Sequence, residues 1–437
     1  MTKIFITINP GFHNKGDGAI LFGALKTLRM LNNAEVTLLS SHPEYDRVQS
    51  EKMGMDLNII STFHPSSERR SIFIKAKQFL FNRPSFVLVS ALIRLFLYKT
   101  FRLKYNGFVK KDVWEEYRKS DIIIVGLNGT FTTMYGIDGF AANFYSIALA
   151  KILRKTVVIY AASIEPFKNK VWEILGRYII NKVDLITLRE KGSYKYVQKI
   201  GVTKPPMHVT ADLAFLLESA SPERVEEIMS IESINKNNEP LIGMTVSRGV
   251  SHWAFPNLKN SKERYTKYID VMGKVVDYLV DKLSATIVFI PHSIKPYGED
   301  RDVGRDIYEK VKNKHKVKVI INDYTPAEIK GIISHCDLVV GARTHSVIIA
   351  SSMCIPSILI AGSIHKPGII SEILGQEEWV YNRTLDFNTL VSKINTLLSN
   401  REKVGEELKP KAKNMEERAL SNGKLVKELM DSLRRTS

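Results

Sequence analysis

The sequence contains few cysteines and no signal-like leader. Of its 437 residues only Cys336 and Cys354 are cysteines, and both lie in apolar segments, so we expect no disulfide and a reducing compartment. Two cysteines in this arrangement do not form a metal-binding motif, and we expect no metal. The N-terminus enters the apolar stretch IFITI almost at once, which predicts a cytoplasmic protein.

The sequence also lacks the glycine-rich motifs of the common nucleotide-binding loops. The turn after the first apolar stretch reads GFHNKGDGAIL, which is not GxGxxG and lacks the Lys-Ser/Thr of a Walker A loop. It still leads from a strand into a helix, as turns at ligand sites do, so Asn14, Gly16 and Asp17 are candidates for substrate binding. Alternatively, Asn14 and Asp17 only shape the turn and cap the helix.

One long segment lacks acidic residues. Between Arg69 and Lys111 there are eleven Lys or Arg residues and no Asp or Glu, in a chain whose formal net charge is +17. The apolar stretch 86–98 within it has 13 residues and contains Arg94, whereas about 20 are needed to cross a bilayer. Such a segment suits an anionic membrane surface; the alternative is a pair of helices with a solvated basic face. Nucleic acid is a third partner class, but no recognisable binding motif accompanies the charge.

A regular alternation of strand and helix patterns runs through the chain. We expect strands near 3–9, 35–40, 121–126, 156–161, 184–188 and 207–210, and then near 241–246, 285–290, 317–321, 337–340 and 356–361. The chain is too long for one ordinary core, so we predict an α/β protein with two Rossmann-like domains, each around a parallel sheet. The predicted parts are 1–217 with a basic apolar insert at 64–118, a linker at 218–240, a second domain at 241–385, and C-terminal helices at 386–437. These helices either pack on the first domain or are solvated.

Charged side chains follow several strands of the second predicted domain. Arg343 and His345 follow LVVGA, Arg248 follows LIGMTVS, and His292 follows TIVFIP. Because the carboxyl ends of parallel strands lie at one edge of a sheet, these residues should converge on one crevice. An arginine there can bind a phosphate or carboxylate through two hydrogen bonds, and a histidine can transfer a proton near neutral pH. The alternative is an arginine that caps a neighbouring carboxylate and a histidine packed against a helix.

Three motifs in order resemble the polysaccharide pyruvyl transferase family. They are GFHNKGDGAILFGALKTLR, then TLREKGSYKYVQKIGV with VTADLAFLL, and then GARTHSVIIASSMCIPSILIAGSIHKPGIISEILG, which together cover nearly the whole chain except the insert. The chain departs from many members at Gly18, where they have an acidic residue, and at Ser363, where they have Tyr. The resemblance implies two Rossmann-like domains facing a cleft, as in the B-type glycosyltransferase fold.

The activity implied by this resemblance is transfer of a pyruvyl group from phosphoenolpyruvate to two hydroxyls of a sugar in a cell-surface glycan precursor. A cyclic ketal forms and phosphate is released, without a cofactor or metal. Cations must bind the phosphate and carboxylate of the donor, and an acid and a base must move protons. The implied catalytic residues are His345, Arg343, Arg248 and His292, and the implied substrate-binding residues are Asn14, Gly16, Asp17, Asn128, Thr130, Arg189 and Lys366. Which histidine is the acid stays open.

Some residues of the first predicted domain also have two interpretations. Asn128 and Thr130 follow a strand and are expected to contact the acceptor sugar. Arg189 follows another strand, where it either binds substrate or forms a structural ion pair with Glu190 that Asp212 could brace.

Two other functions stay open from the sequence. One is a nucleotide-sugar-dependent glycosyltransferase of B-type fold, which would bind its donor mainly through the second domain. The other is a non-catalytic protein that binds a membrane surface or nucleic acid through the insert. The expected partners are phosphoenolpyruvate and a sugar or glycan acceptor. If the insert binds an anionic membrane, the protein works at the inner face of the cell membrane and its acceptor is lipid-linked.

Overall fold

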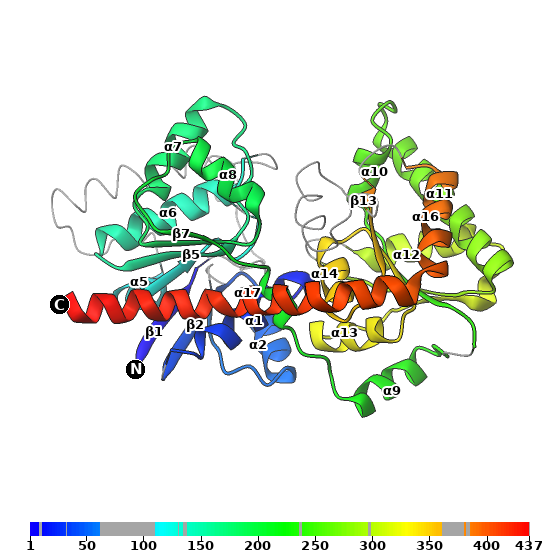
Figure 1. Cartoon of the computed structure of the whole chain (residues 1–437), viewed down its shortest axis with the longest axis horizontal. Helices are drawn as coiled ribbons and strands as arrows, with labels where there is room; N and C mark the ends of the chain where they lie inside the picture. Colours follow the sequence, from blue (N-terminus) through cyan, green and yellow to red (C-terminus); the bar gives the residue numbers. More distant parts are fainter. Residues whose placement is uncertain are drawn as a thin grey trace, which may run out of the picture. The chain divides into compact units, whose positions relative to one another are not determined.

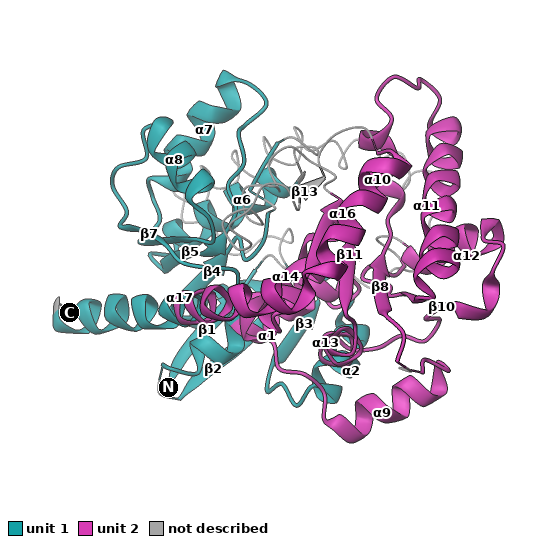
Figure 2. Cartoon of the chain, turned by 45° about the vertical axis from the view of Figure 1, so that its right-hand side comes forward, with its two compact units in different colours: residues 1–11, 24–212, 419–437 teal, residues 12–23, 213–418 magenta. Residues whose placement is uncertain are grey.

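The computed structural model divides into two compact units, which Figure 2 colours separately. It describes residues 1–7, 11–31, 33–61, 110–129, 131–133, 138–235, 238–295, 299–360, 380–381 and 385–436. Unit 1 consists of Met1–Gly11, Ala24–Asp212 and Ala419–Ser437, and unit 2 consists of Phe12–Gly23 and Leu213–Arg418. Each unit is built around one parallel sheet, so the predicted α/β class with two Rossmann-like domains is confirmed.

The described residues of unit 1 form a sheet of seven parallel strands in the order β3-β2-β1-β4-β5-β6-β7. The strands are β1 Thr2–Ile6, β2 Ala34–Ser40, β3 Asn58–Ser61, β4 Ile122–Val125, β5 Thr156–Ala162, β6 Leu185–Leu188 and β7 Met207–Val209. All were expected except β3, a short strand at the edge of the sheet. From β1 the chain first adds β2 and β3 on one side of the sheet and then β4 to β7 on the other side. The switch point therefore lies between β1 and β4, and ligands commonly bind at such switch points of parallel α/β sheets.

One face of this sheet is covered by helices that share an apolar core. These are α5 Lys111–Lys119, α6 Asp138–Ile152, α7 Lys170–Ile180 and α8 Lys191–Lys199 (Figure 1). Val113 and Tyr117 of α5 are buried in this core with Phe140, Ile179 and Val197. The predicted insert 64–118 therefore extends too far, because its last residues belong to a core helix. Residues 62–109 lie outside the described part of the chain.

Among the described residues of unit 2, six parallel strands lie in the order β10-β9-β8-β11-β12-β13. They are β8 Leu241–Thr245, β9 Thr286–Phe289, β10 Val317–Val319, β11 Leu338–Gly341, β12 Ser357–Ile360 and β13 Val380–Tyr381. The two-residue β13 was not expected. The helices are α9 Pro222–Ile231, α10 Arg248–Ala254, α11 Ser261–Leu283, α12 Asp300–Lys310, α13 Pro326–Ser334, α14 Thr344–Ser352 and α16 Phe387–Ser399, with 3-10 helices at Leu213–Leu216 and Lys314–Lys316.

An early segment of the chain belongs to the later unit. Phe12–Gly23 contains most of helix α1 (Lys15–Leu28), and it groups with unit 2. The reason is a short antiparallel pairing, in which the Lys15 amide donates to the His292 carbonyl at 2.8 Å and the Ile294 amide donates to the His13 carbonyl at 3.0 Å. The expected first domain, 1–217, differs from unit 1 here because sequence order does not reveal this pairing.

The expected linker at 218–240 contains a folded helix. Helix α9 begins at Pro222, and the Ser221 hydroxyl caps it by accepting from the Arg224 amide. A Cβ at Gly331 of α13 would lie 2.3 Å from Val225, so α9 packs closely on α13. The segment is therefore part of unit 2 rather than an open linker.

The C-terminal helix α17 (Arg401–Thr436) contributes its residues from Ala419 onward to unit 1. The buried Asn422 amide oxygen accepts from the Thr210 hydroxyl at 2.9 Å, and Arg434 donates to the Thr2 hydroxyl at 3.1 Å. Of the two alternatives for this tail, packing on the first domain is correct. No helix in the described ranges is both long enough and apolar enough to cross a membrane.

Replacing Gly423 with Ala tests this packing. A Cβ at Gly423 would lie 2.3 Å from the Thr27 carbonyl oxygen, so Gly423→Ala should lower the free energy of unfolding by about 1–3 kcal/mol. Gly192→Ala is the control, because the nearest atom to its new Cβ is 4.0 Å away, and it should leave stability unchanged or slightly higher. Urea unfolding of both variants measures the difference, and equal stabilities would contradict the close helix contact.

Candidate active site

Three neighbouring strands of unit 2 bring charged residues to one edge of the sheet. Strands β9, β8 and β11 lie side by side and parallel. His292 lies shortly after β9, Arg248 begins α10 after β8, and Arg343 precedes α14 after β11. His345 is the second residue of α14. The structure therefore places all four predicted catalytic residues at the carboxyl edge of a single sheet.

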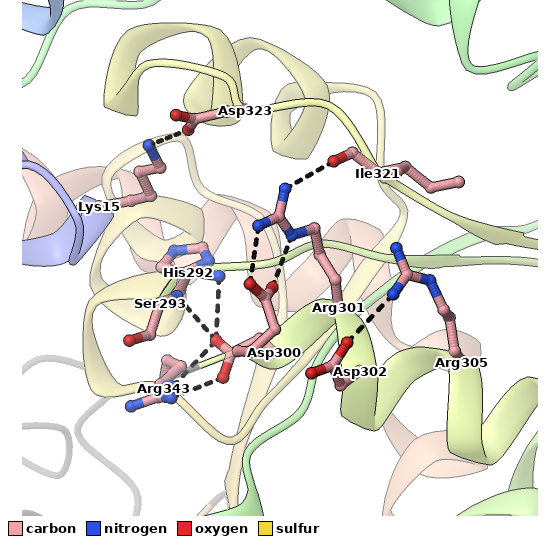
Figure 3. A network of polar contacts seen from close by, with 11 residues as sticks. Lys15, His292, Ser293, Asp300, Arg301, Asp302, Arg305, Ile321, Asp323 and Arg343 are labelled. Carbon is pink, nitrogen blue, oxygen red and sulfur yellow. Dashed lines mark hydrogen bonds and ion pairs between the residues drawn. The ribbon is translucent and has the colours of Figure 1, made fainter. Parts of the chain in front are cut away.

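A buried carboxylate fixes Arg343. Its Nε and Nη2 donate to Asp300 Oδ2 and Oδ1 at 3.1 and 2.6 Å, as Figure 3 shows. Asp300 Oδ2 also accepts the backbone amides of His292 and Ser293 at 3.1 and 2.8 Å. This pairing occupies one side of the guanidinium, so a ligand can meet its outer edge, formed by Nη1 and the second N–H of Nη2. The two interpretations of Arg343, as a carboxylate partner and as an anion ligand, are thus compatible.

His292 is buried beside positive charge. Its side chain is 1% exposed, and neither ring nitrogen makes a hydrogen bond of good geometry within the described residues. Burial, together with the smaller effects of the nearby charges of Arg343, His345 and Lys15, lowers the pKa of His292 to about 3. His292 is therefore a neutral imidazole at neutral pH.

The first turn of α1 lies against His345. A Cβ at Gly16 would be 2.3 Å from His345 Nδ1, so only glycine allows this approach. The Asn14 side chain caps the turn by accepting from the Gly16 amide at 3.0 Å, as the capping interpretation predicted. The N-terminal ends of α1 and α14 thus meet here, and the positive ends of both helix dipoles favour an anion.

Lys15 adds a cation that sequence reasoning missed. Its Nζ contacts Asp323 Oδ1 at 2.5 Å, and the residue is 1% exposed. Burial lowers the pKa of Lys15, while the charge of Asp323 and their hydrogen bond oppose this. Its position between Asn14 and Gly16 was the available signal, but a lysine in a turn normally reaches into solvent.

Asp17 and Gly18 complete the first turn. Asp17 is buried at 6% exposure, in the first turn of α1, where a negative charge is favourable. A Cβ at Gly18 would lie 2.8 Å from both Phe12 and Pro326. The acidic side chain that many sequences of the resembling family have at this position would not fit without a shift of these neighbours.

Arg248 reaches the same edge of the sheet but has a different neighbour. Its side chain is exposed, and its guanidinium lies over the Tyr265 ring at 4.2 Å. The Tyr265 hydroxyl in turn donates to Asp306 at 2.6 Å. The two arginines thus lie at the same edge of the sheet with different partners, Tyr265 for Arg248 and Asp300 for Arg343.

Unit 1 has its own polar cluster at the carboxyl edge of its sheet. Arg189 donates to Asp212 at 2.6 Å and to the Ser163 hydroxyl at 2.6 Å, whereas its distance to Glu190 is 3.8 Å. Asp212 is therefore the closer partner of Arg189, and the expected pair with Glu190 is secondary. The Asn128 carbonyl accepts from the Ser163 amide at 3.3 Å.

The same cluster holds a carboxyl with a shifted pKa. Burial raises the pKa of Glu190, while the charge of Arg189 and hydrogen bonds from Ser193 and Ser163 oppose the rise. The other predicted substrate-binding residues, Thr130 and Lys366, lie outside the described residues. Within the described part of the chain, no group of three or more His, Cys, Asp or Glu side chains is placed to hold a metal ion.

Comparison with known proteins identifies the sequence family of this site. A family model described as polysaccharide pyruvyl transferase matches residues 14–363, which include the first turn of α1 and the residues around β8, β9 and β11. A relative, the amylovoran biosynthesis protein AmsJ of Erwinia amylovora, is 23% identical over 446 residues, covering 99% of this chain and 100% of the relative.

Solved structures show the likeness in fold. UDP-GlcNAc 2-epimerase from Neisseria meningitidis, bound to UDP-GlcNAc, matches with a TM-score of 0.61 and 13% identity over 99% of this chain and 100% of that chain. HepE of Anabaena, in complex with UDP-glucose, matches with a TM-score of 0.60 and 12% identity over the same shares. These likenesses confirm the predicted resemblance to the B-type glycosyltransferase fold.

The role of Asp300 can be tested by removing its charge. Asp300→Asn keeps the shape but leaves Arg343 without its ionised partner, so the free energy of unfolding should fall by about 1–3 kcal/mol. Asp302→Asn on the same helix is the control, because Asp302 is 53% exposed and forms a surface ion pair with Arg305, and it should change stability by less than about 0.5 kcal/mol. Equal losses in urea unfolding would show that Asp300 has no special structural role.

The burial of His292 predicts a pH dependence of stability. Its pKa is about 3 in the folded protein and about 6.5 in an unfolded chain. Between these values only the unfolded chain takes up the proton, so stability is lost as the pH falls through 6.5. From pH 8 to pH 5 this loss should be about 2 kcal/mol, and it should be absent in His292→Gln.

The exposed His315 supplies the matched control for this measurement. His315→Gln should keep the same difference in unfolding free energy between pH 8 and pH 5 as the unmodified protein. If His292→Gln also keeps it, His292 is not the buried neutral group described above.

Proposed function

The chain belongs to the polysaccharide pyruvyl transferase family, and we propose from this premise that it moves a pyruvyl group from phosphoenolpyruvate to two hydroxyls of a glycan precursor. The observation that carries the proposal is the cationic site in unit 2, where the outer edge of Arg343 and the N-terminal ends of α1 and α14 meet beside His292. Phosphoenolpyruvate carries a phosphate and a carboxylate, which are the groups that such a site binds.

Donor binding uses fixed positive groups. Asp300 holds the guanidinium of Arg343, so little conformational freedom is lost when an anion binds to its outer edge. Arg248 lies at the same edge of the sheet with an exposed side chain, and we assign it to the second anionic group of the donor. Lys366 was also predicted from the sequence to bind the donor, and we keep that assignment as part of the proposal.

Proton transfer is assigned to His345. A protonated His345 gives its proton to the methylene carbon, while the first sugar hydroxyl adds to the central carbon of the pyruvyl group. The second hydroxyl then adds to the same carbon as the bond to the phosphate oxygen breaks. One hydroxyl proton returns to His345 and the other leaves with the phosphate, so the reaction is balanced. His292 stays neutral because its pKa is about 3, and we assign it a hydrogen bond to the bound donor.

The acceptor is proposed to be a sugar of a polysaccharide precursor. The relative AmsJ is named for amylovoran biosynthesis, which supports a sugar polymer rather than a small metabolite. Asn128 and Arg189 lie at the carboxyl edge of the unit 1 sheet and are the candidates for contacting sugar hydroxyls. The predicted basic insert, without its last residues in α5, supports a location at the inner face of an anionic membrane and a lipid-linked acceptor.

A nucleotide-sugar-dependent glycosyltransferase is the second candidate. The observation that favours it is the fold, since the solved structures named above were determined with UDP-GlcNAc or UDP-glucose. A UDP-sugar also carries phosphates that suit a helix N-terminus. The two candidates therefore differ in donor, and donor binding separates them.

Phosphoenolpyruvate should stabilise the protein against thermal unfolding. A ligand at about 100 times its dissociation constant adds about 2.7 kcal/mol, so the melting temperature should rise with phosphoenolpyruvate and not with UDP-glucose or UDP-GlcNAc. Arg343→Gln should remove this rise, whereas His345→Ala should keep it. A rise with the UDP-sugars alone would replace the proposal with the second candidate.

Turnover gives the second part of this test. With phosphoenolpyruvate and a glycan-precursor acceptor, His345→Ala should lower phosphate release by about 100-fold or more, because it removes the proton donor. Near-normal phosphate release by a variant that still binds phosphoenolpyruvate would exclude the proton-transfer role of His345.

A further inference from the structure

Unit 1 has a strongly basic surface on helices α7 and α8 and the segments that flank them. Every residue from 163 to 212 is described, and every exposed charged residue in this range is basic. These residues are Lys168, Lys170, Arg177, Lys182, Lys191, Lys195, Lys199 and Lys204. The acidic residues of the range are buried or half-buried, as with Glu190 beside Arg189 and Asp184 beside Lys151. We call this surface the α7–α8 face.

An apolar stripe runs along the outer side of α7. Val171, Ile174 and Tyr178 are 63%, 51% and 59% exposed, and their spacing of three and four residues places them on one side of the helix. The opposite side of α7 is buried through Ile179 and Ile180. Exposed apolar residues usually occur singly on soluble proteins, so a stripe of this kind indicates a binding surface.

Helices α7 and α8 present one continuous surface. They cover the same face of the sheet, because Ile179 and Val197 share its core, and Figures 1 and 2 both show them as neighbours in unit 1. At their C-terminal ends, Asn181 donates to the Gly201 carbonyl at 3.2 Å, and a Cβ at Gly201 would lie 3.2 Å from Arg177. The C-terminal ends of α7 and α8, with the exposed basic residues Arg177 and Lys199, therefore lie next to each other.

We propose that the α7–α8 face binds the surface of an anionic lipid bilayer. Lysines attract the acidic headgroups, and Val171, Ile174 and Tyr178 enter the boundary between headgroups and acyl chains, which is how amphipathic basic helices bind membranes. A tyrosine suits that boundary because its ring is apolar and its hydroxyl is polar. This inference is independent of the donor and of the reaction, and it adds a second contact to that proposed for the insert.

Three other occupants of this surface fit it less well, two because of their charge and one because of the apolar stripe. Residues 69–111 carry eleven Lys or Arg and no Asp or Glu, so the chain's own insert would be repelled by a basic face. A second copy that docks through the same face in a symmetric dimer would meet like charge. Nucleic acid would match the lysines but would leave the aliphatic residues Val171 and Ile174 without a role in phosphate binding.

Co-sedimentation of the full chain with vesicles tests the proposal. The vesicles contain phosphatidylcholine with or without phosphatidylserine. One variant carries Lys195→Gln, Lys199→Gln and Lys204→Gln, and a second carries Val171→Ser, Ile174→Ser and Tyr178→Ser. The matched control carries Lys262→Gln, Lys267→Gln and Lys274→Gln, which removes three exposed lysines from α11 of unit 2. A fourth variant, for the insert, carries Arg94→Gln, Lys99→Gln, Arg102→Gln and Lys104→Gln.

The lysine variant should bind phosphatidylserine vesicles more weakly by on the order of 100-fold, and the apolar variant by about tenfold. The control should bind like the unmodified protein. Added salt should weaken the binding of the unmodified protein and of the control to phosphatidylserine vesicles. The phosphoenolpyruvate-dependent rise in melting temperature should be unchanged in both α7–α8 variants, which separates this proposal from the proposed reaction and reports that they are folded.

Several results would overturn the proposal. These are no binding of the unmodified protein to phosphatidylserine vesicles, equal losses in the lysine variant and the α11 control, or loss of binding only in the insert variant. Double-stranded DNA is the competing probe. If the lysine variant loses DNA binding and keeps vesicle binding, the surface binds nucleic acid instead.

Discussion

The candidate site of unit 2 is held together by the hydrogen bonds of the Asp300 carboxylate. This carboxylate binds the guanidinium of Arg343 and also accepts the amides of His292 and Ser293. The carbonyl of His292 accepts a hydrogen bond from the Lys15 amide. A series of hydrogen bonds therefore connects the start of α14 to the loop after β9, and that loop to the first turn of α1. A buried carboxylate is tolerated only when it is paired and hydrogen-bonded, and here each of its bonds also positions a residue of the site.

This link explains why the site is assembled within one unit from the two ends of the chain. The first motif contributes Asn14 and Gly16, and the late motif contributes Arg343 and His345. Because residues 12–23 pair with the loop that contains His292, the turn after β1 is part of the C-terminal sheet's site. Unit 1 keeps a separate polar cluster around Arg189, which is why donor and acceptor are assigned to different units.

Much of the fold could be predicted because buried parallel strands are nearly continuous apolar runs. The missed strands, Asn58–Ser61 and Val380–Tyr381, are short edge strands with too few residues to form such a run. Strand ends also predicted the positions of Arg343 and His345. Asp300 could not be recognised, because it lies in the acidic run GEDRD, and only the tertiary structure separates it from its exposed neighbour Asp302.

The electrostatics of the site connect anion binding to proton chemistry. Burial and the charges of Arg343, His345 and Lys15 keep His292 neutral, so the free site has fixed positive groups and an uncharged imidazole among them. A bound phosphate or carboxylate would offset those positive charges, and it would raise the pKa of His292 from its value of about 3. Donor binding therefore weakens the repulsion that keeps a proton off His292, but the burial of the ring, which is the larger cause, remains, so His292 serves as the neutral hydrogen-bonding partner of the donor.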